Sequence, residues 1–118
     1  MTTHEVANRL VELCRQGKIE ETLKELFADD AVSTETSDFM GVKVVEGLPA
    51  IFKKNEFFNS MVEEFHGATI SDPIVAGPYF SVAWTLDATM KERGKQHMEE
   101  ICLYKVKDGK IVSEQFFY

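Results

Sequence analysis

The sequence predicts an α+β fold in which N-terminal helices pack on one face of a strongly curved, mainly antiparallel sheet. Two observations support this prediction. Amphipathic helical patterns dominate the first half of the chain, and alternating strand patterns fill its end, over Pro78–Met90, Gln96–Lys107 and Lys110–Tyr118. A long meander covered by helices on one side forms a cone. We expect its concave face to hold a small molecule.

Two amphipathic helices are expected before residue 30. Thr2 and Glu5 have the spacing of a capping box, in which each side chain bonds a backbone N–H at the start of a helix. Gly17 ends this helix, and Asp29-Asp30 is expected to stop the second one. The apolar face of the first helix consists of Val6, Leu10, Leu13 and Cys14, and that of the second of Ile19, Leu23, Leu26 and Phe27.

A short strand pair and a third helix follow. Ala31–Thr36 and Val42–Val45 have the composition of short strands, and Gly47 ends the second of them. Pro49 fits the first turn of a helix, where its missing N–H costs nothing. This helix is expected to fray by Ser60, and its apolar side chains are Ile51, Phe52, Phe57 and Phe58.

Strands account for the rest of the chain. Met61–Ala76 is the first, interrupted near Gly67 and at Asp72-Pro73, because proline cannot donate to a sheet ladder. Arg93-Gly94 and Asp108-Gly109 have the composition of hairpin turns. In the strand after Pro78 the even-numbered side chains are apolar: Phe80, Val82, Trp84, Leu86, Ala88 and Met90.

The strand over Gln96–Lys107 has apolar groups on both faces, because Ile101 and Leu103 alternate with Cys102 and Tyr104. A sheet that is covered on both sides fits helices on one face and a second subunit on the other. We therefore expect a homodimer through the outer face of the sheet. The register around Arg93-Gly94 leaves open whether Trp84 or Thr85 faces the cone.

The composition argues against several classes of partner. The chain has 118 residues, enough for one domain with a single core. Its net charge of −7 argues against nucleic acid, because phosphate binding needs a clustered basic surface. No apolar run reaches the length of a membrane span, and the first residues lack a signal sequence, so we expect a cytoplasmic protein without a membrane partner.

The sequence has no motif for a metal or cofactor. Cys14 and Cys102 lie in apolar patterns and are expected to be free, buried thiols, with a disulfide as the open alternative. His4, His66 and His97 are too dispersed for a metal site. A glycine-rich phosphate loop is also missing, so we expect neither metal nor cofactor.

Several short motifs occur in a characteristic order. They are residues 17–20 (GKIE), residues 26–32 (LFADDAV), Glu46-Gly47, Val82-Ala83-Trp84 and residues 107–111 (KDGKI). In this order the sequence resembles the nuclear transport factor 2 superfamily, which includes ketosteroid isomerases and SnoaL-like polyketide cyclases. The resemblance covers almost the whole chain. It implies a cone-shaped (cystatin-like) roll and a single SnoaL-like domain over residues 1–118.

The resemblance to ketosteroid isomerase implies Glu35 as a general base. The two oxyanion donors of that enzyme match Leu10 or Val11 and Cys102, and none of these side chains is a strong hydrogen-bond donor. Because losing even one such donor typically costs about two to three orders of magnitude in rate, steroid isomerisation by that mechanism is not expected.

SnoaL-like cyclases use a carboxylate on the sheet as acid or base, and the candidates here are Glu100, Glu114 and Asp87. Glu114 lies between Val112 and Phe116 on an apolar face. A carboxylate in that position must be paired, protonated or directed into a wet pocket. The alternative is a strand register that places Glu114 on a solvated face.

We therefore expect the domain to bind a small, largely apolar molecule in the cone, with isomerase-like or cyclase-like acid/base chemistry by Glu35 or Glu114. The expected pocket consists of Leu10, Phe57, Trp84, Glu100, Cys102 and Phe116. Two alternatives remain, a non-catalytic binding or protein-interaction module and a structural dimer without a ligand. An open cavity with converging polar groups would favour the enzyme, whereas a cone filled by its own aromatic side chains would favour the module.

Overall fold

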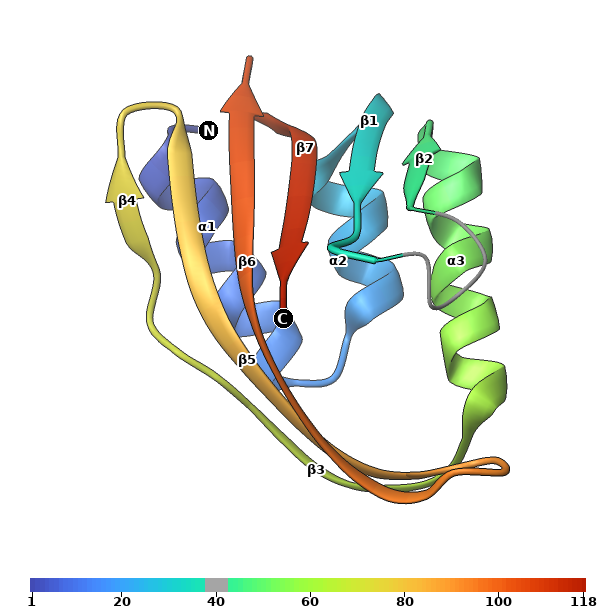
Figure 1. Ribbon diagram of the computed structural model, residues 1–118. Coiled ribbons are helices and arrows are strands. Elements are labelled where there is room, and N and C mark those ends of the chain that lie inside the picture. Colours follow the sequence, from blue (N-terminus) through green and yellow to red (C-terminus); the bar gives the residue numbers. More distant parts are fainter. Residues whose placement is uncertain (38–42) are drawn as a thin grey trace.

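The computed structural model describes residues 1–37 and 43–118, and in it three helices lie along one face of a curved seven-stranded sheet (Figure 1). The helices are α1 (Thr3–Arg15), α2 (Ile19–Leu26) and α3 (Leu48–Met61). The strands are β1 (Phe27–Thr34), β2 (Val44–Glu46), β3 (Val62–Ile70), β4 (Ile74–Ala76), β5 (Tyr79–Met90), β6 (Gly94–Lys107) and β7 (Lys110–Phe117). The predicted α+β class is confirmed, and the sheet curls without closing into a barrel.

The sheet has the strand order β2-β1-β7-β6-β5-β3, with β4 paired to β5. β1 runs parallel to β7, and the other paired strands are antiparallel, so the mainly antiparallel character is as expected. β5 and β6 bend together toward the end of α3 in Figure 1, which gives the sheet its concave face. The concave face is turned toward the helices, so a cavity can lie between the sheet and the helices.

The helix ends lie close to the residues at which short sequence signals predicted them. Thr2 and Glu5 form the predicted capping box at the start of α1, and Gly17 has the positive φ of +74° expected after a helix. Pro49 lies in the first turn of α3. This helix ends at Met61, close to the expected end near Ser60.

The boundary between α2 and the first strand differs from the prediction. The pair Asp29-Asp30 was expected to end the helix, but α2 ends at Leu26 and the two aspartates lie inside β1. The register of β1 against β7 shifts between Phe27 and Val32, and this irregularity leaves both aspartates on the exposed side. Val42, which was assigned to the second strand, lies outside the described residues.

The remaining strand boundaries agree with the prediction or refine it. The long strand expected over Met61–Ala76 is divided into β3 and β4 around Asp72-Pro73, and its register shifts near Gly67. The hairpin at Asp108-Gly109 has positive φ at both residues, 52° and 76°, as a two-residue turn of this kind requires. The other turn precedes Gly94, which already pairs with Met90 as the first residue of β6.

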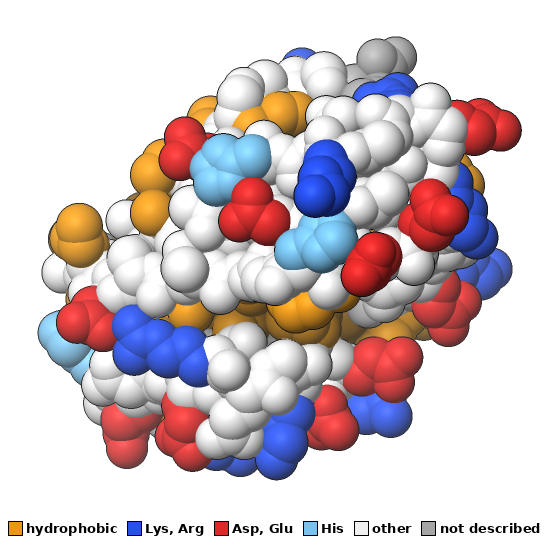
Figure 2. Space-filling view, turned by 90° about the horizontal axis from the view of Figure 1, so that it is seen from below, with side chains coloured by type: hydrophobic (Ala, Val, Ile, Leu, Met, Phe, Trp, Pro, Cys, Tyr) orange, Lys and Arg blue, Asp and Glu red, His pale blue; other side chains and the backbone are white. Residues whose placement is uncertain are grey.

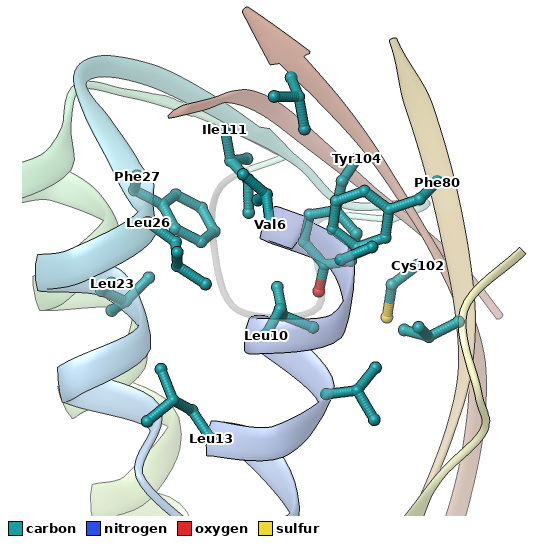
Figure 3. Close-up of a cluster of buried hydrophobic side chains, with 14 of the residues drawn as sticks. Val6, Leu10, Leu13, Leu23, Leu26, Phe27, Phe80, Cys102, Tyr104 and Ile111 are labelled. Carbon is teal, nitrogen blue, oxygen red and sulfur yellow. The ribbon is translucent and has the colours of Figure 1, made fainter. Parts of the chain in front are cut away.

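The core lies between α1, α2 and the sheet, where Phe80 stacks on Tyr104 with 4.8 Å between ring centroids (Figure 3). The ring of Phe27 meets Tyr104 edge-on from the other side. Leu10 and Leu26 reach the same cluster from the two helices and are fully buried. This packing fixes α1 against the sheet, and with it one wall of the concave face.

The outer face of the sheet carries half-exposed apolar side chains. Ile101, Phe117 and Tyr79 retain 49%, 50% and 43% of their accessible surface. A second subunit could cover these side chains, and the homodimer through this face stays a prediction. None of the helices in residues 1–37 and 43–118 combines the length and apolar character needed to cross a membrane.

Candidate functional site

A cavity of about 1290 Å³ lies between the concave face of the sheet and the helices. Figure 2 shows apolar side chains in a hollow at one end of the molecule, with charged side chains around it. The apolar part of the cavity wall includes Leu10, Ile51, Phe58, Ile70, Trp84 and Leu86. Its charged part includes Glu35, Lys54, Glu100 and Glu114. The cavity is therefore open and amphipathic, with several ionisable groups on its wall.

Helix α3 supplies one wall of the cavity through a single face. Ile51, Lys54, Asn55 and Phe58 follow one another at helical spacing, and all four line the cavity. Ile51 anchors this face in the core, where it is 2% exposed. The packing of Ile51 therefore sets the rotation of α3 that turns Lys54 toward the sheet.

Lys54 is the centre of a polar network that crosses from α3 to β1. Its Nζ donates to Glu35 Oε1 at 2.8 Å and to Ser33 Oγ at 2.6 Å. The same ammonium group lies 4.9 Å from the ring centroid of Phe116 on β7, a distance at which a cation is attracted to an aromatic face. The side chains of Lys54 and Glu35 are only 10% and 7% exposed, so this ion pair is largely removed from solvent.

Ser33 connects the ion pair to Glu114 on β7. The Ser33 hydroxyl donates to Glu114 Oε1 at 2.7 Å, and the Glu114 residue is 6% exposed. Burial raises the pKa of Glu114 to about 7, against the opposing effects of the Ser33 hydrogen bond and of Lys54. The negative charges of Glu35 and Glu100 add to the rise. Near neutral pH this carboxyl group is therefore available as either acid or base.

Glu100 on β6 is the third carboxyl group of the cavity. Its Oε1 accepts a hydrogen bond from the Cys102 thiol at 3.5 Å, and burial raises its pKa. Trp84 pairs with Glu100 across β5 and β6, and the Trp84 side chain packs against the core and lines the cavity. This arrangement places an aromatic ring beside a carboxyl group whose charge is disfavoured.

The two cysteines are free and poorly suited to be nucleophiles. Burial raises the pKa of Cys14 to about 11, and burial also raises the pKa of Cys102. Because the thiolate is the reactive form, both side chains are expected to stay neutral and inert. Both cysteines are free, as expected, and Cys102 is buried, whereas Cys14 is only partly buried.

Most of the predicted pocket residues line the cavity. These are Glu35, Glu114, Leu10, Trp84, Glu100 and Phe116. Phe57 does not line the cavity and is 49% exposed, whereas Phe58, one position further along α3, does line it. Cys102 does not line the cavity either, because it is buried in the core (Figure 3), where its thiol donates to Glu100.

Lys54, which makes three contacts in this network, was not among the site residues predicted from the sequence. Glu35 was expected as a general base, and in the structure it forms an ion pair with Lys54. The signal for Lys54 was its position three residues after Ile51 and four before Phe58, on the inner face of α3.

The remaining candidate carboxylate lies apart from this network. Asp87 was a candidate acid or base, but it is exposed on β5 and bonds His97 Nδ1 at 2.7 Å. Neither Asp87 nor His97 lines the cavity. Among the described residues, no group of three His, Cys, Asp or Glu side chains is arranged to hold a metal ion.

Comparison with known proteins identifies relatives of this chain. A family model described as the SnoaL-like domain matches residues 1–118. A crystal structure from Mesorhizobium loti, of a candidate SnoaL-like polyketide cyclase [carbohydrate phosphatase], is 34% identical with a TM-score of 0.94, and all of both chains is covered. No protein with a curated description matches the sequence.

More distant structures share the fold alone. A protein of unknown function with a cystatin-like fold from Xanthomonas campestris is 15% identical with a TM-score of 0.83, covering 99% of this chain and 90% of that one. A hypothetical protein with a ketosteroid isomerase-like fold from Catenulispora acidiphila, in complex with trimethylamine, is 19% identical with a TM-score of 0.75, covering 99% and 87%.

Proposed function

Because the chain belongs to the SnoaL-like domain family, we propose that it binds a small, largely apolar molecule in the cavity and exchanges a proton with it through Glu114. One observation carries the proposal. Glu114 is a buried carboxyl group on the wall of an open cavity of about 1290 Å³, and burial raises its pKa to about 7. A general acid or base is most effective when its pKa lies near the working pH.

The ligand is expected to be largely apolar because of the side chains that surround the cavity. Leu10, Ile51, Phe58 and Trp84 offer apolar surface on the helix side and the sheet side. A few polar groups in an apolar pocket orient a ligand. Here these groups lie together near Lys54, so a polar substituent of the ligand would be directed toward that end.

Glu114 is assigned the acid/base role in preference to Glu35. Glu35 is already engaged, because its Oε1 accepts a hydrogen bond from Lys54 Nζ at 2.8 Å in a largely buried ion pair. Glu114 lies one hydrogen bond further from the ammonium group, through Ser33. As a base it would remove a proton from a carbon next to a carbonyl group, and as an acid it would return that proton to oxygen or carbon.

Two observations favour this function over the alternatives. The cavity volume supports ligand binding over a purely structural dimer. The convergence of Glu35, Lys54, Glu100 and Glu114 on one wall supports chemistry over a passive binding module. No cofactor is needed for proton exchange at a carbon next to a carbonyl group.

Exchange of carbon-bound hydrogen tests the proposal without knowledge of the natural substrate. With 2-tetralone, an apolar ketone, in deuterated buffer, the wild-type protein is expected to accelerate deuterium uptake beside the carbonyl group. Glu114→Gln is expected to lower this rate about a hundredfold, the lower range for loss of a general base. The rate is followed by proton NMR.

The matched control is Glu64→Gln, which removes an exposed carboxylate of β3 outside the cavity wall. This variant is expected to exchange deuterium at the wild-type rate. Equal rates for Glu114→Gln and the wild type would contradict the role of Glu114. A wild-type rate no faster than buffer alone would favour the non-catalytic binding module.

A further inference from the structure

We infer that Lys54 and Ser33 are positioning residues that fix which oxygen of Glu114 carries the exchangeable proton, so that Oε2 alone meets the ligand. This inference rests on the proposed role of Glu114 as acid or base. It concerns how the protein presents the carboxyl group.

The direction of the hydrogen bonds follows from the chemistry of their donors. An ammonium group has three donors and no acceptor, so Lys54 Nζ must donate to Ser33 Oγ across their 2.6 Å contact. A serine hydroxyl has a single hydrogen. With Oγ accepting from Lys54, that hydrogen is free to point at Glu114 Oε1, which lies 2.7 Å away. Lys54 therefore fixes the direction in which the Ser33 hydroxyl donates its hydrogen bond.

Lys54 is itself held in place from three sides. Its Nζ contacts Ser33 Oγ, Glu35 Oε1 and the face of the Phe116 ring. These three contacts match the three N–H donors of an ammonium group. Ser33 lies on β1, Glu35 directly after it and Phe116 on β7, whereas Lys54 comes from α3. The donor-to-acceptor direction of these hydrogen bonds is thus set by the packing of the helix on the sheet and not by the ligand.

The second oxygen of Glu114 is left for the cavity. Within the described residues Glu114 Oε1 accepts from Ser33, and Oε2 has no hydrogen bond to the protein. Every buried side-chain nitrogen or oxygen of the described residues has a partner, so Oε2 retains accessible surface. Glu114 lines the cavity, and this surface therefore faces the space where the ligand would bind.

Because Oε1 already accepts a hydrogen bond, a proton added to Glu114 is expected on Oε2. In the neutral state Oε2–H donates to the ligand, and in the ionised state the same atom accepts a proton from it. No rotation of the carboxyl group is needed between the two states. Lys54 and Ser33 hold the group without giving up or taking a proton themselves.

The charged groups around Glu114 come from several elements. Glu35, directly after β1, and Glu100 on β6 disfavour its ionised form, and Lys54 on α3 favours that form. Any change at Lys54 therefore alters both the charge near Glu114 and the direction of the Ser33 hydroxyl. The experiment must separate these two effects, and it must do so in protein without a ligand.

Infrared difference spectroscopy between acidic and alkaline pH reports the carbonyl stretch of protonated Glu114, identified by its loss in Glu114→Gln. Ser33→Ala removes the donor to Oε1 and is expected to shift this band to higher frequency. The double variant Glu35→Gln/Lys54→Met removes the ion pair without leaving a buried charge, and it is expected to shift the band in the same direction. Adding Ser33→Ala to this double variant is expected to produce little further shift.

Lys53→Met is the matched control, since Lys53 is the exposed neighbour on α3. This variant removes a lysine charge from the same helix outside the network and is expected to leave the band unchanged. An unshifted band in Ser33→Ala would overturn the inference. The inference would also fail if Ser33→Ala shifted the band equally with and without Lys54, because the hydroxyl would then not depend on the lysine. These results are independent of whether the protein catalyses exchange on a ketone.

Discussion

Replacing Lys54 with methionine is expected to lower the free energy of unfolding by about 3 kcal/mol, the lower range for breaking a buried ion pair by removing one partner. The loss arises because the carboxyl group of Glu35, only 7% exposed at its side chain, would lose its ammonium partner 2.8 Å away. The contact with Phe116 and the donor to Ser33 are lost as well. The lower range applies because both side chains also line an open cavity. Urea denaturation measures the change.

Two controls separate the ion pair from a general effect of charge. Lys53→Met, on the exposed side of the same helix, is expected to change the free energy of unfolding by no more than about 0.5 kcal/mol. Glu35→Gln/Lys54→Met is expected to recover much of the loss, because no buried charge is then left without a partner. A double variant as unstable as Lys54→Met would show that the loss comes from packing and not from the unpaired carboxylate.

Glu114→Gln is expected to change how stability depends on pH. The pKa of Glu114 is raised from 4.5 to about 7 in the folded protein, so between these values the folded state binds more protons than the unfolded state. The stabilising contribution of neutral Glu114 is present below pH 4.5 and is lost as the pH rises through about 7. At about 1.4 kcal/mol per pKa unit, the wild type loses roughly 3 kcal/mol more than Glu114→Gln on going from acidic to alkaline pH.

This prediction is checked by urea denaturation of both proteins at several values of pH between 4 and 9. The difference between their free energies of unfolding isolates Glu114, because the other titrating groups are common to both. Glu64→Gln is the control and is expected to follow the wild-type curve. A constant difference between wild type and Glu114→Gln across this pH range would mean that the carboxyl group titrates alike in the folded and unfolded states.

Local patterns in the sequence were sufficient to predict most of the fold. The capping box at Thr2, the turn at Asp108-Gly109 and the alternation along β5 each depend on neighbours in the chain. Glu114 was predicted for the same reason, since its position between apolar residues of β7 indicates which face it occupies. Features set by neighbouring residues could therefore be inferred without tertiary information.

The errors concern features that depend on how elements pack. Phe57 and Phe58 differ by one position on α3, and only the rotation of the helix against the sheet decides which of them lines the cavity. The ion pair between Lys54 and Glu35 joins a helix to a strand, and a lysine at that position could equally extend to solvent. The irregularity that places Asp29-Asp30 in β1 depends on its pairing with β7.

Binding in the cavity is the central claim, and the fluorescence of Trp84 tests it most directly. Trp84 is the single tryptophan of the chain and lines the cavity. The uncharged probe N-phenyl-1-naphthylamine is expected to quench it saturably, with a Kd on the order of micromolar. Asn55→Phe, which fills the cavity from α3, is expected to weaken binding, whereas the exposed Glu56→Phe is expected to bind as the wild type does. Quenching that does not saturate, or that is equal in Asn55→Phe and the wild type, would contradict a ligand site in the cone.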